Sequence, residues 1–413
     1  MTETYVVVGA SLAGARAVET LRKEGFDGRV VLVGAEHHVP YDRPPLSKEV
    51  MLGRKAPGEL VIHPPDFYSE NNVELLLGVR ATKIDTHARR VELDHGRAVT
   101  ADKVLLCTGT TPRRPVIPGL HLEGVHFLRT VEDSLAIRDA LVNGVSLVIV
   151  GGGLIGIELA ASARALGNDV TVLERDSGLM RRVLGTQIGD RLSRMHTEQG
   201  VRICTDTEVA RIEGDRRVRR VHTSHGAVID ADVVVIGVGV LPATEIVDGS
   251  NIAVDNGIRV DTFCETSVSG VYAAGDVANQ PLDAGGARIR LEHWQNAQNQ
   301  GIAAARSMLG HREPYREVPW FWSDQGETNI QAAGHLTPSD DIVWRGDPES
   351  LEFTAFHLRD GVLTGVVGVN RRRDVRMAMA HIDKKICPEP GALADPAVDL
   401  RTIGDTAASS GIK

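Results

Sequence analysis

Cysteine is scarce in this chain of 413 residues, and the few that occur exclude several kinds of site. They are Cys107, Cys204, Cys264 and Cys387. No C-x-x-C pair and no metal-ligand spacing is present, so the sequence predicts no metal site. Residues 1–104 contain no cysteine, which argues against disulfide chemistry beside a cofactor in that region. Scattered free thiols indicate a reducing compartment, and we expect a cytoplasmic protein.

Long apolar runs are also scarce, and acidic residues outnumber basic ones. The first apolar run, residues 5–8, is too short to cross a bilayer or to form the core of a signal peptide. The formal net charge of -9 argues against nucleic acid and anionic membranes as partners. The composition, with 42% hydrophobic and 24% charged residues, is that of an ordinary soluble chain, long enough for two or three domains.

The clearest motif lies in residues 147–161, LVIVGGGLIGIELAA. Its apolar start predicts a buried strand, and apolar residues at helical spacing follow the turn. Between them, Gly151, Gly153 and Gly156 form the pattern G-x-G-x-x-G. The first glycine allows a tight turn, the second lets the backbone approach a pyrophosphate, and the third lets helix and strand pack closely. The motif therefore predicts a dinucleotide site.

An acid completes this site. A second predicted strand, residues 169–173, ends at Glu174, at about the twenty-residue spacing expected for a ribose-binding carboxylate. Such a carboxylate accepts both ribose hydroxyls of NADH and repels the extra phosphate of NADPH. The neighbouring Arg175 softens that choice, but the sequence favours NADH.

A second, weaker copy of the motif opens the chain. A predicted strand over residues 5–8 is followed by Gly9, Ser11 and Gly14, and a helix continues to about residue 23. Ser11 replaces the middle glycine but is small enough for phosphate approach. The next strand, residues 29–33, leads to another acid, Glu36. Two dinucleotide sites in one chain imply electron transfer between two cofactors, usually a flavin and a nicotinamide.

Several shorter segments extend these units. YDRPPLSK, residues 41–48, contains two prolines that predict a stiff, extended segment carrying Arg43 and Lys48. Residues 103–107 and 232–236 are predicted strands that lead to turn residues. The predicted turns and cofactor-edge residues here are Thr108, Gly109, Gly237, Gly239, Asp276 and Val277. Asp276 follows a short strand and could bind a ribityl hydroxyl or cap a helix.

The C-terminal part has a different pattern. Pro319–Gln325, PWFWSDQ, holds three aromatics in a chain with only 4% aromatic residues, and we interpret it as a lid on a flavin ring rather than a core cluster. Alternating segments at residues 330–333, 341–345, 351–358 and 362–369 predict an antiparallel sheet, with a helix at 374–385.

The sequence thus predicts an α/β protein with two Rossmann-like domains and a small α+β C-terminal domain. The predicted boundaries are residues 1–111 and 236–318 for the first nucleotide-binding domain, 112–235 for an inserted one, 319–402 for the C-terminal domain and 403–413 for a flexible tail.

Taken in order, these motifs resemble the FAD- and NADH-dependent ferredoxin reductases that serve bacterial haem monooxygenases and Rieske-type dioxygenases. The matching stretches are YDRPPLSK, CTG, GGGLIGIELA, AAGDVA, EHWQNAQNQG, PWFWSDQ and GVNRRRDVRMA. Departures occur at Ser11, Cys107, His293 and Gly326–Glu327. The resemblance covers almost the whole chain and implies a glutathione-reductase-like fold with FAD and NADH as cofactors.

The resemblance also implies roles for particular residues. Those implied at the FAD site are Gly9, Gly14, Glu36, Arg43, Lys48, Asp276 and Trp322. Further cofactor-binding residues are expected without a choice between the two sites, and they are Ser11, Thr108, Gly109, Arg129, Val277, His293, Trp294, Gly237 and Gly239. Those implied at the NADH site are Gly151, Gly153, Ile155, Gly156, Glu158, Glu174 and Arg175. Lys48, near the flavin ring, Glu158, near the nicotinamide amide, and Trp322 are the implied catalytic residues.

The implied reaction is a relay from NADH through FAD to a [2Fe–2S] ferredoxin. Such ferredoxins are acidic, and a basic run could dock one, although it could equally be a solvated surface. The run consists of Arg371, Arg372, Arg373 and Arg376. An NADH oxidase and a flavin-based redox-signalling protein remain alternatives.

Overall fold

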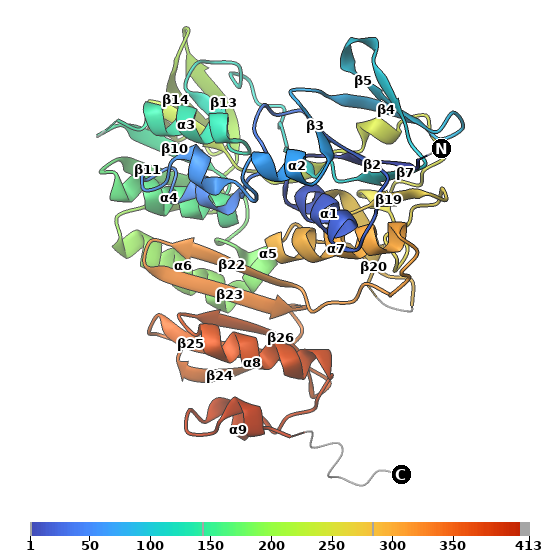
Figure 1. The fold of residues 1–413 in the computed structure, drawn as a ribbon. Helices are drawn as coiled ribbons and strands as arrows, with labels where there is room; N and C mark the ends of the chain where they lie inside the picture. Colours follow the sequence, from blue (N-terminus) through green and yellow to red (C-terminus); the bar gives the residue numbers. More distant parts are fainter. Residues whose placement is uncertain (1, 143, 283–284, 405–413) are drawn as a thin grey trace. The chain divides into compact units, whose positions relative to one another are not determined.

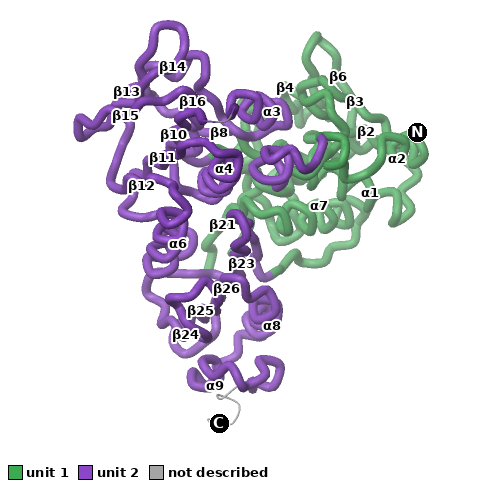
Figure 2. The backbone as a smooth tube through the Cα atoms, turned by 90° about the vertical axis from the view of Figure 1, so that its left-hand side faces the viewer, with its two compact units in different colours: residues 1–43, 57–111, 240–317 green, residues 44–56, 112–239, 318–413 purple. Residues whose placement is uncertain are grey.

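The computed structural model describes residues 2–142, 144–282 and 285–404. The predicted flexible tail lies almost wholly outside these residues. The chain divides into two compact units, coloured separately in Figure 2. Unit 1 comprises residues 1–43, 57–111 and 240–317, and unit 2 comprises residues 44–56, 112–239 and 318–413.

Unit 1 is built on a five-stranded parallel sheet. In spatial order its strands are β19 (Val271–Ala273), β7 (Lys103–Leu106), β1 (Thr4–Val8), β2 (Arg29–Gly34) and β3 (Val73–Leu77). Helices α1 (Leu12–Lys23) and α7 (Trp294–Met308) pack against each other beside this sheet, where Figure 1 shows them running together. Their close approach requires Gly301, since a Cβ there would lie 2.4 Å from the carbonyl oxygen of Ala13.

Smaller elements complete unit 1. They are α2 (Asp66–Glu70), the antiparallel strands β4 (Ala81–Asp85), β5 (Arg90–Leu93) and β6 (Ala98–Thr100), and the strands β18 (Ile258–Arg259), β20 (Ala278–Pro281) and β21 (Arg288–Arg290). The central strands are buried on both faces, as their continuous apolar sequences predict.

Unit 2 contains a second five-stranded parallel sheet. Its strands in spatial order are β12 (Arg202–Cys204), β11 (Asp169–Leu173), β10 (Ser146–Val150), β16 (Val233–Ile236) and β9 (Val125–Phe127). The accompanying elements are α3 (Val131–Ala140), α4 (Leu154–Ala165), α5 (Arg181–Leu184), α6 (Thr186–Glu198), β13 (Val209–Gly214), β14 (Val218–Thr223) and β15 (Val228–Asp230).

An antiparallel sheet forms the C-terminal part of unit 2, as the alternating pattern predicted. Its strands are β22 (Trp320–Gln325), β23 (Thr328–Gly334), β26 (Val362–Val369), β25 (Glu352–Arg359) and β24 (Asp341–Asp347), followed by α8 (Arg372–Asp383) and α9 (Pro390–Ala394). Alternation along β25 sends Phe353 into a core with α5 and α6, and Phe356 into a core with α8. The sheet is therefore covered by helices on both faces.

Two local expectations were wrong. Pro44–Ser47 is a 3-10 turn, not an extended segment, because the φ angle fixed by proline suits both conformations. The expected helix start at Asp276 is a single 3-10 turn, Gly275–Val277, capped by Ala274, so Asp276 is not a helix cap.

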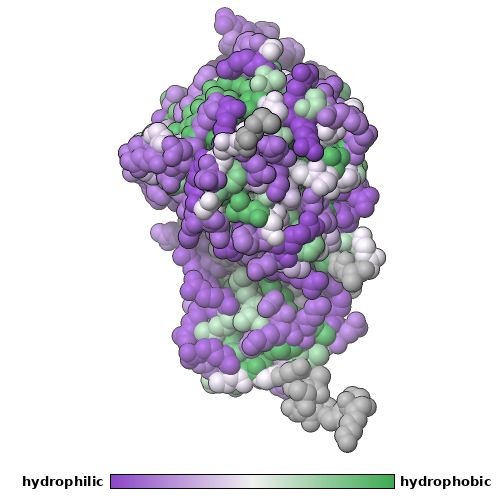
Figure 3. Space-filling view, turned by 45° about the vertical axis from the view of Figure 1, so that its right-hand side comes forward, coloured by the Kyte–Doolittle hydropathy of each residue, from purple (hydrophilic) through white to green (hydrophobic). Residues whose placement is uncertain are grey.

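The surface shows no extended apolar region on the face in Figure 3, where hydrophilic residues surround small apolar groups. In the parts of the chain that the structure describes, no helix has the length and apolar character needed to cross a bilayer.

Candidate functional site

The N-terminal glycine turn of unit 1 leaves no room for side chains at two positions. Gly9 has a φ of +116°, and a Cβ there would lie 2.1 Å from the carbonyl oxygen of Cys107. A Cβ on Gly14 would lie 2.1 Å from the carbonyl oxygen of Gly9. Ser11 caps α1 without a side-chain hydrogen bond to the helix, which leaves the first backbone N–H groups for an anion. The turn therefore suits a phosphate.

The acid of this unit is held by two neighbours. The Arg43 guanidinium lies 2.6 Å from Glu36 Oε1, and the Tyr41 hydroxyl donates to Glu36 Oε2 at 2.5 Å. Burial alone would lower the pKa of Arg43, but Tyr41 and Glu36 outweigh it and raise that pKa. These two contacts hold the Glu36 carboxyl group in a fixed orientation.

Other predicted cofactor-site residues also lie in unit 1. Thr110 Oγ1 donates to Asp276 Oδ2 over 3.4 Å, and Trp294 Nε1 donates to Asp42 at 2.7 Å. His293 is the residue that caps α7. Thr108 donates its hydroxyl to the Ala243 carbonyl, and Gly109 has a φ of +67°. Val277 is wholly buried in the apolar core.

The glycine turn of unit 2 repeats this construction. Gly151 has a φ of +110°, and a Cβ there would lie 2.3 Å from the carbonyl oxygen of Gly237. A Cβ on Gly156 would lie 2.2 Å from the carbonyl oxygen of Gly151. Gly153 differs, because no described atom lies within 4 Å of its Cβ position. It caps α4 beside the exposed side chain of Ile155, so the backbone is open to a pyrophosphate.

Glu174 is fixed at the end of β11 by two backbone N–H groups. Gly152 donates to Oε2 at 2.6 Å, and Asp176 donates to Oε1 at 2.7 Å. The exposed Arg175 and Arg182 both form ion pairs with Asp176. Asp176 was missed in the sequence, and it pairs with both of these arginines.

We expect Glu174→Ala to narrow the preference for NADH over NADPH about tenfold, since repulsion of the extra phosphate is lost. The measurement is kcat/KM with each coenzyme, with Glu208→Ala, an exposed acid nearby in the chain, as the control. An unchanged ratio would remove Glu174 from coenzyme selection.

A buried polar cluster surrounds Glu158, whose residue is only 6% exposed. Its Oε1 lies 3.4 Å from Lys48 Nζ and accepts from the Ser323 hydroxyl at 2.8 Å. Its Oε2 accepts from the Ser47 hydroxyl at 2.5 Å. Burial raises the pKa of Glu158, and Lys48 and the two serines oppose that rise. The cluster joins α4, β22 and the 44–56 segment, all within unit 2.

The aromatic motif forms the neighbouring wall. Lys48 Nζ lies 5.8 Å from the centroid of the Trp322 ring, which stacks on Trp320 with centroids 5.3 Å apart. Asp324 Oδ2 lies 3.5 Å from Lys48 Nζ and shares that cation with Glu158. Sequence reasoning missed Ser47, Ser323 and Asp324, although all three stand within the quoted motifs.

Three more predicted residues have backbone roles in unit 2. The Arg129 N–H donates to the Asp133 carboxylate in the cap of α3. The Gly237 N–H donates to the Val150 carbonyl, and Gly239 has a φ of +96° with open space at its Cβ position. These contacts position the loop after β16, beside the Gly151 turn.

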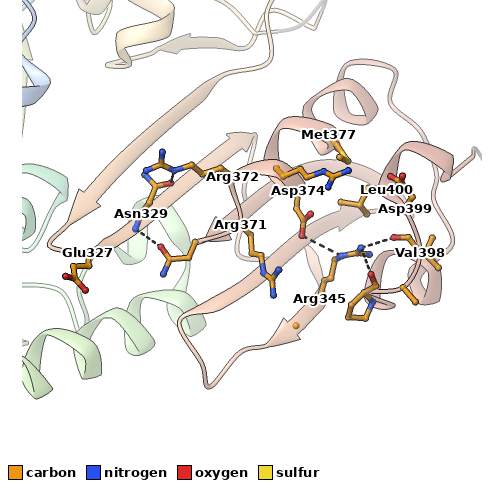
Figure 4. A pocket seen from close by; sticks show the side chains of 15 residues that line it. Glu327, Asn329, Arg345, Arg371, Arg372, Asp374, Met377, Val398, Asp399 and Leu400 are labelled. Atoms are coloured by element: carbon orange, nitrogen blue, oxygen red, sulfur yellow. Dashed lines mark hydrogen bonds and ion pairs between the residues drawn. The ribbon is translucent and has the colours of Figure 1, made fainter.

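Three residues of the basic run, Arg371, Arg372 and Arg373, line a polar cavity of about 710 Å³ on the C-terminal sheet (Figure 4). Arg371 pairs with Glu352, and Arg372 bonds to Asn329 and lies 3.7 Å from Asp324. Arg373 and Arg376 are exposed and form no ion pair with the described residues.

Two glycine turns on two parallel sheets, each with an acid after its second strand, define an oxidoreductase that binds two dinucleotides. The family model for pyridine nucleotide-disulphide oxidoreductases matches residues 3–301, and the reductase C-terminal model matches residues 320–404. The chain belongs to the pyridine nucleotide-disulphide oxidoreductase family and, within it, to the ferredoxin–NAD(+) reductases.

Curated relatives match from end to end. The chain is 38% identical to the ferredoxin–NAD(+) reductase component of the anthranilate 1,2-dioxygenase system of Burkholderia cepacia, covering 97% of this chain and 99% of that protein. It is also 38% identical to rhodocoxin reductase of Rhodococcus erythropolis, covering 96% and 93%.

Solved structures agree. Putidaredoxin reductase, in its covalent complex with putidaredoxin, matches with a TM-score of 0.94 and 32% identity over 99% of both chains. A ferredoxin reductase from Rhodopseudomonas palustris matches with a TM-score of 0.93 and 34% identity, covering 97% of this chain and 99% of that one. The predicted fold class, enzyme class and cofactors, FAD and NADH, are confirmed.

Proposed function

We propose that this chain carries a hydride from NADH to FAD and passes electrons singly to a [2Fe–2S] ferredoxin, which feeds a cytochrome P450 monooxygenase or a Rieske-type oxygenase. The observation that carries this proposal is the presence of two complete nucleotide turns in a chain that matches ferredoxin reductases over nearly its whole length. We propose the cytoplasm as the compartment, which suits its four free thiols.

The residues of unit 1 fit FAD. The Gly9 turn and the start of α1 would hold the pyrophosphate, Glu36 would bind the adenosine ribose, and Asp276 would bind a ribityl hydroxyl. The further residues proposed for FAD are those predicted from the sequence. We assign residues 1–111 and 236–318 to this domain, 112–235 to the NADH domain and 319–402 to the C-terminal domain.

The residues of unit 2 fit NADH. The open Gly153 backbone would receive the pyrophosphate, Glu174 the ribose, and Glu158 the nicotinamide amide. Bound FAD supplies a ring that accepts two electrons as a hydride and releases them one at a time. Lys48, which lies beside the Trp322 ring, would supply a buried positive charge to the negative charge that develops during hydride transfer.

The disulfide chemistry in the family's name does not extend to this chain, because it needs a cysteine beside the flavin and residues 1–104 contain none. Cys107 and Cys264 are buried, and burial raises the pKa of both thiols, which keeps them protonated and unreactive.

The test is an anaerobic mixing experiment with the purified yellow protein. NADH should bleach the flavin absorbance, and an added oxidised [2Fe–2S] ferredoxin should then be reduced. Bleaching without transfer to any of several ferredoxins would favour an NADH oxidase or a redox-signalling protein. An absence of bleaching would contradict the NADH site itself.

For docking, we propose that Arg373 and Arg376 meet the acidic ferredoxin, since Arg371 and Arg372 are already paired. We expect Arg373→Glu/Arg376→Glu to raise the KM for ferredoxin about tenfold at low ionic strength, with a smaller effect at high salt. Flavin bleaching by NADH should not change. Arg219→Glu, an exposed site on β14, is the matched control, and an equal effect there would indicate net charge rather than docking.

A further inference from the structure

Ser323 and Gln325, in the second half of the PWFWSDQ motif, belong to a buried chain of hydrogen bonds. His196 on α6 meets Gln325 Oε1 at 2.8 Å, Gln325 Nε2 donates to Ser323 Oγ at 3.3 Å, and Ser323 donates to Glu158. His196, Gln325 and Ser323 are each 0% exposed. The chain therefore crosses from α6 through β22 to α4 without meeting water.

The direction of every donor in this series follows from the hydrogen bond at its end. Ser323 donates its single proton to Glu158 Oε1 at 2.8 Å. Its oxygen is then the acceptor for Gln325, whose amide nitrogen must face it. The amide oxygen of Gln325 consequently faces His196, which must carry its proton on Nε2.

The other ring nitrogen supports the same assignment. His196 Nδ1 is buried and has no hydrogen-bond partner among the described residues. An unpaired acceptor is tolerated more often than an unpaired N–H, so the proton belongs on Nε2. Burial lowers the pKa of His196, which favours this neutral form.

We propose that Ser323, Gln325 and His196 are positioning residues that hold the Glu158 carboxylate ionised and in one orientation for the nicotinamide amide. This inference rests on the proposed role of Glu158. It gives Gln325, together with Ser323, a role at the Glu158 site. The donors all point toward Glu158, so each bond strengthens the next.

The groups that surround Glu158 determine how this chain of hydrogen bonds can affect the carboxyl. Lys48 approaches from the 44–56 segment, Asp324 on β22 reaches it only through Lys48, and α6 contributes the neutral His196. Losing the Ser323 hydroxyl removes one of the groups that hold down the pKa of Glu158, so that pKa should rise.

The first test reads the tautomer in wild-type holoenzyme. Nitrogen NMR of the protein labelled with ¹⁵N-histidine, with His196→Asn to assign the signal, should show His196 neutral and protonated on Nε2. An Nδ1-protonated or charged ring would overturn the proposed chain, whatever the role of Glu158.

The second test uses Ser323→Ala and Gln325→Met, with Ser193→Ala as the control. Ser193 is half-buried on α6, the helix that carries His196, and donates one hydrogen bond to the Gly189 carbonyl of the same helix. Stopped-flow bleaching by NADH should be roughly tenfold slower in the two test variants, and its acid limb should move to higher pH in Ser323→Ala. The control should match wild type after both are checked for FAD content and melting temperature.

Two outcomes distinguish a failure of the positioning role from a failure of the proposed role of Glu158. If Glu158→Gln slows bleaching but Ser323→Ala and Gln325→Met behave like the control, the positioning role is wrong and the proposed role of Glu158 stands. If Glu158→Gln bleaches at the wild-type rate, the proposed role of Glu158 fails, and the positioning role fails with it, while the NMR result still decides whether the hydrogen-bond chain exists.

Discussion

Gly153→Ala should raise the Kd for NADH about 10- to 100-fold while leaving the melting temperature of the protein unchanged. The added methyl group meets no protein atom, because nothing described lies within 4 Å of that Cβ position. It does project from the residue that caps α4, where the proposed pyrophosphate would approach the backbone. A loss of binding without a loss of stability is therefore the signature of a ligand site.

Gly156→Ala provides the contrasting variant in the same turn. Its Cβ would lie 2.2 Å from the Gly151 carbonyl oxygen, so we expect it to cost about 1–3 kcal/mol of stability. Gly58→Ala, where the Cβ position is also open, serves as the neutral control. The measurements are NADH titration of the oxidised enzyme and thermal unfolding. Wild-type affinity in Gly153→Ala would place the pyrophosphate elsewhere.

The second large effect is expected from Lys48→Met, which should slow hydride transfer about 100-fold. The variant removes the buried cation that Glu158 and Asp324 share. Stopped-flow bleaching of the flavin by NADH measures the effect. Lys55→Met, an exposed lysine of the same segment, is the control, and equal rates in the two variants would exclude an electrostatic role for Lys48.

The same variant should also change how stability depends on pH. Burial already raises the pKa of Glu158, and loss of Lys48 should raise it further. A carboxyl whose pKa is raised in the folded state stabilises the fold at low pH and loses that contribution as the pH rises through its folded pKa. The melting temperature of Lys48→Met should therefore fall further below wild type at pH 8 than at pH 5.5. Adding Glu158→Gln should remove most of this pH dependence.

The glycine turns were predictable because each glycine answers a local steric demand. Gly9 and Gly151 adopt positive φ angles and lie against the carbonyl oxygens of Cys107 and Gly237, the residues directly after β7 and β16. The strands of the C-terminal sheet were predictable from alternation, although β22 was read only as an aromatic lid. Proline was ambiguous, since its fixed φ fits the observed 3-10 turn at Pro44–Ser47 as well as an extended chain.

Only part of the Glu158 cluster could be predicted from the sequence. Lys48 and Glu158 were chosen through the family resemblance, but nothing local connects residues more than a hundred positions apart. Ser323 donates to a carboxylate 165 residues away, which only tertiary packing can arrange. For the basic run, the sequence did not distinguish residues that the structure separates. All four arginines looked alike in the sequence, whereas the fold pairs Arg371 and Arg372 with acids.

Helix α4 is capped by Gly153 and carries Glu158 five residues later. At 1.5 Å per residue the two are separated by about 7.5 Å along the helix axis. Because the helix is rigid, it fixes the distance between the proposed pyrophosphate and nicotinamide sites. Its length cannot be adjusted by one residue, because an insertion would swing Glu158 by about 100° around the axis. A coenzyme with a different distance between its pyrophosphate and its nicotinamide would need a helix that spaces these two positions differently.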